Sequence, residues 1–345
     1  MPRAVHEQAE AGERRRTALV ATALVAVIAV TGLLIAKWLP YGQRIATLSG
    51  TRSWTSASLL GGARPGLATG WRFLLAYGQA VWVALVAAVL IGAAVEALLP
   101  RKLLLRGPAR GPVSGALFAL PGMMCTCCTA PVVSAMRRRG AGLGATVSYW
   151  LGNPVLNPAV LAFLALIGPW QWTLTRIVAG AALVLGAGTL ADRLPWTAPA
   201  RMPAPAVAGG GRARRFARAL ARFAVILVPE YALVVFVVGA FGPWLFPLDA
   251  GRPDNAAVAL LIALVLGVLV VIPTGGEIPV VLGLAAAGFP PLVLGALLIT
   301  LPALSLPSML MVGRALGWRT TALAAACVVP GGVAGGVLLA ALTPG

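Results

Sequence analysis

Long apolar runs, separated by short polar and basic segments, make up most of this chain. Most of them reach the ~20 residues that a helix needs to cross the hydrocarbon core of a bilayer. The runs are Thr17–Ala36, Phe73–Val95, Gly111–Met136, Gly140–Thr175, Asn255–Gly276, Ile278–Gly313 and Thr320–Gly345. The pattern predicts an all-α polytopic membrane protein with about seven full spans and two re-entrant or broken helix hairpins.

Composition and charge agree with this class. Charged residues make up 10% of the chain and hydrophobic residues 59%, with a mean hydropathy of +0.91, whereas soluble domains carry about 25% charged residues. The net charge of +18 comes from basic residues that lie between the apolar runs, where they determine topology. We therefore expect the lipid bilayer of the cell (inner or plasma) membrane as a partner, and no nucleic acid.

Changes in composition divide the chain into five parts. Residues 1–16 are predicted to be a cytoplasmic tail and 17–39 an extra first transmembrane helix. Its apolar run is longer than that of a signal peptide, and no cleavage site follows it. Residues 72–191 and 218–341 are predicted to be two transmembrane repeats. The Pro-, Gly- and Arg-rich segment 192–217 is predicted to be an unstructured cytoplasmic linker.

The two halves match each other at a shift of 148 residues. "APVVSAMRRRGAGLGATVSYWLGNPVLNPAVL" then lies over "IPVVLGLAAAGFPPLVLGALLITLPALSLPSML". Matched Pro and Gly residues mean matched breaks in the backbone. The pairs are Pro131 with Pro279, Gly140 with Gly288, Pro154 with Pro302, and Asn157 with Ser305. We predict an internal duplication, as in many transporters.

The basic residues favour opposite orientations for the two copies. Arg110 and Arg137 lie on the same side if Gly111–Met136 enters and returns as a re-entrant hairpin, and 255–287 then enters from the other face. The second repeat is therefore predicted to be inverted. The arginines after the first helix, Arg44, Arg52, Arg64 and Arg72, do not fit this topology. A broken helix that spans the bilayer is the alternative.

Both hairpins break at short motifs, "CTCCTAP" and "PTGGEIP", which are expected to meet near the bilayer midplane and form a substrate site. Cysteine often packs as a small hydrophobe, but Cys125, Cys127 and Cys128 fall within four positions. This spacing at a break favours thiolate binding of a soft species, or redox chemistry. A structural zinc site needs four Cys or His ligands, and the one histidine, His6, lies in the tail.

Glutamates and amides inside the apolar segments are further candidates. Glu277 and Glu230 are predicted to be proton-coupling groups, although Glu277 could instead bond to free amides at its break. Glu96 is predicted to pair with Arg101 or Lys102 at the interface. The side chains of Asn153, Asn157 and Ser305 would either line the pocket and orient an oxygen-bearing ligand, or satisfy a proline kink.

"CTCCTAP" followed by "RRGAGLGATVSYWLGNPVLNP" resembles the ArsP-type predicted permeases. Their signature is a Cys-Ser-Cys-Ser-Thr-x-Pro-like stretch, a Gly-Ala-rich turn and a helix with a Pro-x-x-Asn motif. The positions that match are Cys125, Cys127, Thr129, Pro131, Pro154 and Asn157. Cys128 stands where a serine is usual. The resemblance covers about 74–340 and leaves the first helix outside.

The resemblance implies a permease that exports trivalent organoarsenicals or arsenite, driven by protons. The three cysteines and Thr129 would bind the substrate, and Cys128 would favour inorganic As(III), which takes three sulfurs. We expect no enzymatic activity, no cofactor and no ATPase domain in this chain, because no catalytic set or phosphate loop is present. A homodimer is compatible with the sequence.

Two other functions stay open. Cys125 and Cys128 form a C-x-x-C, the spacing of a membrane thiol–disulfide carrier, although "PTGGEIP" supplies no partner cysteine. A permease for another sulfur-containing or soft-metal solute would use the same thiols.

Overall fold

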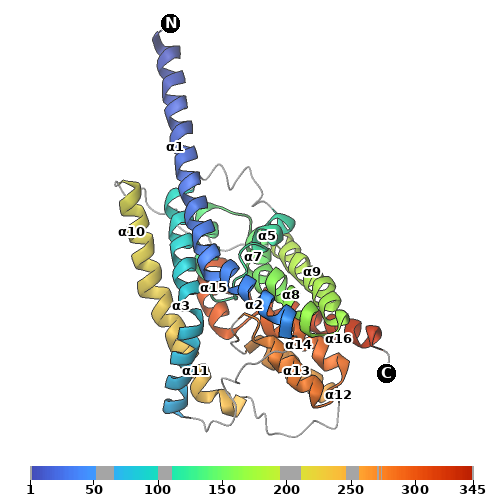
Figure 1. Cartoon of the computed structure of the whole chain (residues 1–345). Helices are drawn as coiled ribbons and strands as arrows, with labels where there is room; N and C mark the ends of the chain where they lie inside the picture. The colour runs from blue at the N-terminus through green and yellow to red at the C-terminus, as the bar shows by residue number, and fades with distance from the viewer. Residues whose placement is uncertain are drawn as a thin grey trace.

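The computed structural model describes residues 2–51, 66–99, 111–194, 211–245, 256–269, 272 and 274–343, and every element in these ranges is helical (Figure 1). Six of the described helices are long and apolar enough to cross a membrane. The number is seven if α14 (Pro291–Ala303) and α15 (Leu306–Leu316), bent by 50° at their junction, form one span. The prediction of an all-α polytopic membrane protein is confirmed.

The N-terminal helix is longer than the predicted 17–39. α1 (Pro2–Leu33), a π-helical turn η1 (Leu34–Trp38) and α2 (Leu39–Thr51) follow one another without interruption. Pro40, the second residue of α2, lies two residues after the end of the π-helical turn, where the altered hydrogen-bond pattern accommodates a residue without an N–H. The start of α1 projects beyond the bundle (Figure 1).

The first half of the bundle contains six helices in the described residues. They are α3 (Leu67–Leu98), α5 (Pro112–Ala119), α6 (Ala130–Arg139), α7 (Leu143–Val155), α8 (Pro158–Ile167) and α9 (Trp170–Arg193). The second half contains α10 (Arg212–Arg222), η3 (Phe223–Leu227), α11 (Val228–Leu245), α12 (Ala256–Leu269), α13 (Glu277–Ala286), α14, α15 and α16 (Trp318–Leu342). The helices α14, α15 and α16 begin 148 residues after α7, α8 and α9.

The residues paired by the predicted repeat occupy equivalent places in these helices. Gly140 and Gly288 follow α6 and α13 with φ values of 93° and 76°, the left-handed region in which glycine ends a helix without strain. Pro154 and Pro302 lie in the last turns of α7 and α14, while Asn157 and Ser305 precede α8 and α15. These positions support the repeat; its inverted orientation stays a prediction.

The two predicted hairpins each consist of two short helices around a break. α5 and α6 have 8 and 10 residues, and α12 and α13 have 14 and 10, so none of them spans a bilayer alone. Pro131 and Pro279 lie in the first turns of α6 and α13, where their missing N–H groups cost nothing. The return of each hairpin to its own membrane face stays a prediction.

The predicted linker 192–217 falls mostly on 195–210, which lies outside the described residues. Its first residues complete α9 and its last ones begin α10. Both flanking helices are therefore longer than the composition indicated.

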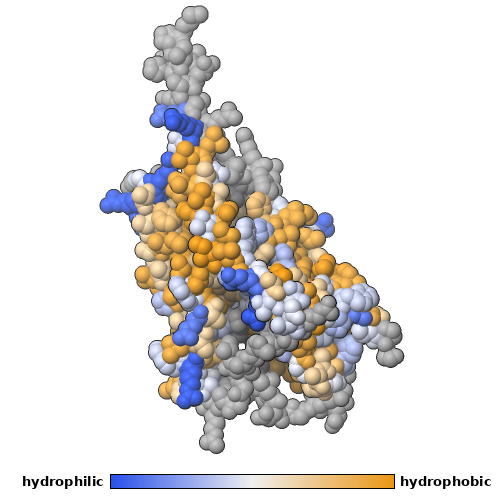
Figure 2. All heavy atoms as spheres, viewed as in Figure 1, coloured by the Kyte–Doolittle hydropathy of each residue, from blue (hydrophilic) through white to orange (hydrophobic). Residues whose placement is uncertain are grey.

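Exposed apolar side chains cover the outside of the bundle. Leu19 on α1, Trp82 on α3 and Leu261 on α12 are each more than 60% exposed. Figure 2 shows that hydrophobic residues dominate the described surface on this face. Such a surface is suited to lipid, because a bilayer solvates apolar side chains.

Inside the bundle, small residues let helix backbones approach closely. α14 packs against α16, and a Cβ added at Gly335 would lie 2.5 Å from Cγ1 of Ile299 and 2.8 Å from the carbonyl oxygen of Gly295. Membrane helices associate mainly through such close packing, because lipid tails are as apolar as the side chains and no hydrophobic effect drives the helices together.

We expect Gly335→Val to destabilise the protein by ~1–3 kcal/mol, the usual effect of overpacking. Gly186→Val on α9 is the matched control, because nothing lies within 4 Å of the added Cβ. Thermal unfolding of the purified proteins in detergent measures the difference. Equal melting temperatures for the two variants would contradict the close packing of α14 on α16.

Candidate functional site

The segment between α5 and α6 folds into a compact turn that carries the three cysteines. The N–H groups of Thr129 and Ala130 donate to the carbonyl oxygens of Cys125 and Cys127, both at 3.2 Å. The Thr129 hydroxyl donates to the carbonyl oxygen of Thr126 at 2.6 Å. The turn therefore satisfies part of its own backbone, as non-helical chain inside a membrane protein must.

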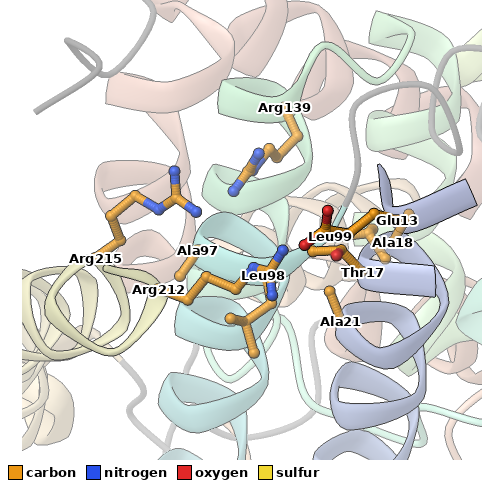
Figure 3. A pocket seen from close by; sticks show the side chains of 10 residues that line it. All are labelled: Glu13, Thr17, Ala18, Ala21, Ala97, Leu98, Leu99, Arg139, Arg212 and Arg215. Carbon is orange, nitrogen blue, oxygen red and sulfur yellow. The ribbon is translucent and has the colours of Figure 1, made fainter. Parts of the chain in front are cut away.

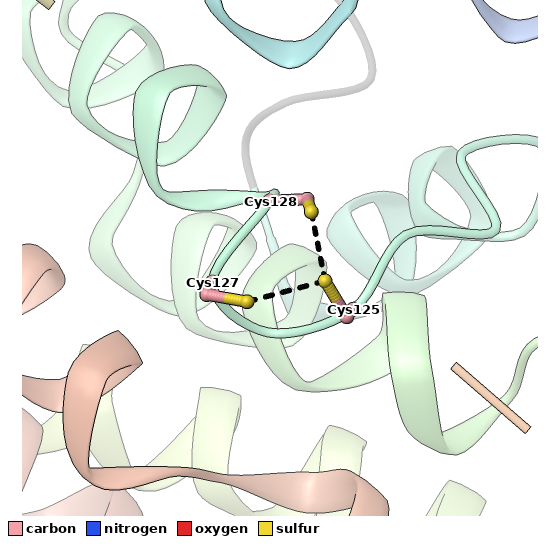
Figure 4. A group of neighbouring side chains, drawn as sticks. All are labelled: Cys125, Cys127 and Cys128. Carbon is pink, nitrogen blue, oxygen red and sulfur yellow. Dashed lines mark hydrogen bonds between the residues drawn. The ribbon is translucent and has the colours of Figure 1, made fainter. Parts of the chain in front are cut away.

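The turn brings the three thiols together. The Sγ atom of Cys125 lies 3.2 Å from that of Cys127 and 2.8 Å from that of Cys128 (Figure 4). All three sulfurs lie within 4.8 Å of one another, and each side chain is at most 4% exposed. Sulfurs at this spacing can bind one soft atom together.

The second break carries the carboxylate of Glu277. Gly275 has a φ of 85° in the turn that precedes α13, and Glu277 is the first residue of that helix. Its carboxylate is 3% exposed and forms an ion pair with Arg176, whose Nη2 lies 2.7 Å from Oε1. The predicted alternative, a carboxyl bonded to free amides, is not the interaction that the described residues show.

Arg176 connects three helices. Its guanidinium is completely buried; Nε donates to the carbonyl oxygen of Val155 at 3.0 Å, and Nη2 donates to that of Pro154 at 2.9 Å. These carbonyl oxygens lie at the end of α7, where the helix cannot supply partners. Sequence reasoning missed Arg176 because it borders the uncharged run that ends at Thr175, the usual place of an interfacial arginine.

The two breaks meet at a small cavity. A hydrogen bond of 3.1 Å joins the hydroxyls of Thr126 and Ser305, one from each half. Beside it lies a cavity of about 10 Å³. Its polar lining comprises Cys125, Thr126, Thr274, Glu277 and Ser305, and Pro154 and Pro302 add to its wall. This volume holds about one water molecule, so the site is closed to any larger solute in this conformation.

Asn153 and Asn157 form hydrogen bonds with backbone groups and do not line this cavity. The side chain of Asn153 accepts a bond from the N–H of Met124 at 3.4 Å and donates to the carbonyl oxygen of Tyr149 at 2.9 Å. Oδ1 of Asn157 caps α8 by accepting from the N–H groups of Ala159 and Val160. Of the two predicted roles, the satisfied kink fits these contacts better.

The N-terminal helical segment also contacts the stretch of chain that precedes the cysteine turn. Lys37, in the π-helical turn, is 7% exposed and donates to the Tyr41 hydroxyl at 3.2 Å. Its ammonium lies within electrostatic range of Cys125 and Cys128. The neighbouring Trp38 donates its indole N–H to the carbonyl oxygen of Pro121 at 2.9 Å. A buried lysine in a membrane protein is a candidate functional residue. In the sequence, however, Lys37 directly follows an apolar run, where a lysine usually extends from the helix end to the membrane surface, so the sequence did not single it out.

The remaining glutamates lie outside the cavity lining. Glu230 lies 3.4 Å from Nη1 of Arg314 and is 19% exposed. Glu96 contacts Arg222, and lies 3.8 Å from Nε of Arg138. Its predicted partners, Arg101 and Lys102, lie outside the described residues. Next to Glu230, the Tyr231 hydroxyl lies 3.8 Å from the sulfur of Cys127, a contact that local sequence does not reveal.

Six or seven apolar spans in the described residues, together with a buried thiol site at a helix break, indicate a multi-pass membrane protein. The chain belongs to the UPF0718 family. It is 40% identical over 334 residues to the UPF0718 protein YraQ of Escherichia coli strain K12, a match that covers 92% of this chain and 94% of the relative. No family model and no solved structure matches the chain.

The family and the spanning helices together suggest a membrane permease. The match to YraQ covers more of the chain than the range of about 74–340 that resembles the ArsP-type permeases. Membership of the ArsP type itself stays a prediction.

We expect Glu277→Gln and Arg176→Gln to destabilise the protein by roughly 3–5 kcal/mol each, because either change leaves the other group buried without its partner. The double variant Arg176→Gln/Glu277→Gln should recover part of this loss. Glu230→Gln should cost less than about 1 kcal/mol, because its arginine partner is 64% exposed. Thermal unfolding in detergent measures all four, and additive losses in the double variant would contradict a direct interaction.

Proposed function

We propose that the protein is a permease that exports a soft, thiophilic solute across the cell membrane, most directly a trivalent arsenical. One observation carries the proposal: Cys125, Cys127 and Cys128 place three buried sulfurs within 4.8 Å of one another, and Cys125 lines the cavity between the two breaks. This donor set suits a soft substrate better than a hard cation.

The chemistry of binding balances without any further reactant. Arsenite, As(OH)₃, exchanges its three hydroxyl groups for the three thiols: three As–S bonds form, three As–O bonds break, and three water molecules leave. A methylated arsenical offers two exchangeable positions and would use two of the sulfurs. Thiols reached from the cytoplasm stay reduced and available for this exchange.

Proton coupling is the second part of the proposal. Glu277 lines the same cavity as Cys125 and pairs with Arg176. A proton on Glu277 would neutralise its carboxylate and weaken the link between α13 and α9, which would help the site to open. Glu230, beside the cysteine neighbour Tyr231, is the other candidate.

Several further expectations belong to this proposal. The partners would be the lipid bilayer and a small soft-metalloid substrate, with no nucleic acid, no cofactor and no ATPase domain in this chain. The protein would not be an enzyme. A cytoplasmic N-terminus and a homodimer stay predictions.

Uptake into everted membrane vesicles tests the proposal. We expect vesicles with a proton gradient to take up arsenite or methylarsenite. Cys125→Ser and Cys127→Ser should reduce uptake by roughly tenfold, equivalent to about 1.4 kcal/mol of binding free energy. Cys128→Ser should reduce arsenite uptake more than methylarsenite uptake. Cys327→Ser, outside the cluster, is the control and should leave uptake unchanged.

Thiosulfate serves as a third substrate in the same vesicles. Uptake of thiosulfate alone would replace the arsenical with a sulfur-containing solute. Uptake of none of the three, or full uptake by Cys125→Ser, would sink the proposal.

A thiol–disulfide carrier is the second candidate, favoured by the 2.8 Å between the sulfurs of Cys125 and Cys128. A carrier must cycle through a disulfide between them, whereas a permease need not. We expect acid quenching and alkylation of cells to find all three thiols of the cluster reduced. A disulfide that accumulates in wild type and is lost in Cys128→Ser would establish the carrier instead.

A further inference from the structure

A second and much larger cavity lies at the other end of α6, away from the cysteine turn. Its volume is about 680 Å³, and it is bounded by α1, α3, α6 and α10 (Figure 3). The residues that line it are Glu13, Thr17, Ala18, Ala21, Ala97, Leu98, Leu99, Arg139, Arg212 and Arg215. The set combines three arginines with alanine and leucine side chains.

Three guanidinium groups give one side of the cavity a strong positive charge. Arg139 comes from the last turn of α6, and Arg212 and Arg215 come from the first turn of α10. Figure 3 shows the three side chains extending into the space between these helices and α1. Glu13 is the one acidic residue in the described lining, so the lining is cationic overall.

The apolar residues of the lining lie at the ends of two candidate membrane spans. Ala18 and Ala21 come from the beginning of the apolar part of α1, whose candidate span starts at Arg16. Ala97 and Leu98 come from the last turn of α3, whose span ends at Leu98. Both candidate spans end at this cavity, and the ends of spanning helices are where lipid phosphates meet hydrocarbon.

We propose that this cavity binds the headgroup of an anionic phospholipid. Arginine forms paired hydrogen bonds with phosphate oxygens, and basic pockets at the ends of membrane helices attract anionic lipids. The alanines and leucines of the lining would contact the glycerol and the first methylenes of the acyl chains. A zwitterionic lipid fits less well, because its ammonium group would meet three arginines and one carboxylate.

Such a lipid would connect the two elements that flank the thiols. α6 begins directly after the cysteine turn, and α10 continues through η3 into α11, where Tyr231 contacts Cys127. A phosphate held by Arg139 on one side and Arg212 and Arg215 on the other would hold these elements at a fixed distance. The inference does not depend on which solute the thiols bind.

Binding of fluorescent phosphatidylglycerol to the purified protein in detergent tests the proposal, with phosphatidylcholine and inorganic phosphate as the other probes. We expect phosphatidylglycerol to bind at least roughly tenfold more tightly than phosphatidylcholine, since each basic residue contributes to the attraction of anionic lipid. Arg212→Gln/Arg215→Gln should reduce this preference to less than about twofold. Arg214→Gln/Arg218→Gln is the matched control, because it removes the same charge from exposed positions of α10 that do not line the cavity.

A variant that binds more tightly shows that the losses of affinity do not come from misfolding. Glu13→Gln removes the one carboxylate of the described lining and should increase the affinity for phosphatidylglycerol. Equal affinities for the two lipids, or an equal loss in the control pair, would overturn the proposal. Displacement of phosphatidylglycerol by an equal concentration of inorganic phosphate would show that the cavity binds free anions, and this result would also overturn the proposal.

Discussion

The ion pair between Arg176 and Glu277 is the interaction on which the centre of this bundle depends. A helix that breaks inside a membrane protein exposes carbonyl and amide groups that no water can solvate, and each unsatisfied group costs several kcal/mol. Arg176 satisfies two carbonyl oxygens at the end of α7 and, through Glu277, fixes the start of α13 in the other half. One guanidinium thus joins the end of α7 in the first half to the start of α13 in the second.

The positions of the breaks could be predicted from the sequence, because they depend on local chemistry. Pro131 and Pro279 suit a first helical turn, where no N–H is needed, and Gly140 and Gly288 adopt backbone angles that other residues avoid. Such residues act through their own backbone, so a sequence match at 148 residues was enough to find their places. The clustered cysteines were evident because they are neighbours in the sequence.

The partners across the bundle could not be predicted in this way. Lys37, Arg176 and Tyr231 each lie far along the chain from the residues that they approach, and only packing brings them near the breaks. Both cations also border apolar runs, where a charge ordinarily marks a membrane interface. The role of Asn157 could not be predicted either. Its spacing allowed it to line the pocket or to satisfy a proline kink, and in the structure its amide oxygen caps α8.

The hydroxyl pair of Thr126 and Ser305 has a different consequence from the charged pair beside it. Either hydroxyl can act as the donor, and neither carries a charge, so water entering between them would replace the lost hydrogen bond on both sides. Separating Arg176 from Glu277 would leave two ions in an apolar interior. The two halves are therefore easier to separate at the Thr126–Ser305 hydrogen bond than at the Arg176–Glu277 ion pair. Water would enter first between the two hydroxyls, next to the sulfur of Cys125.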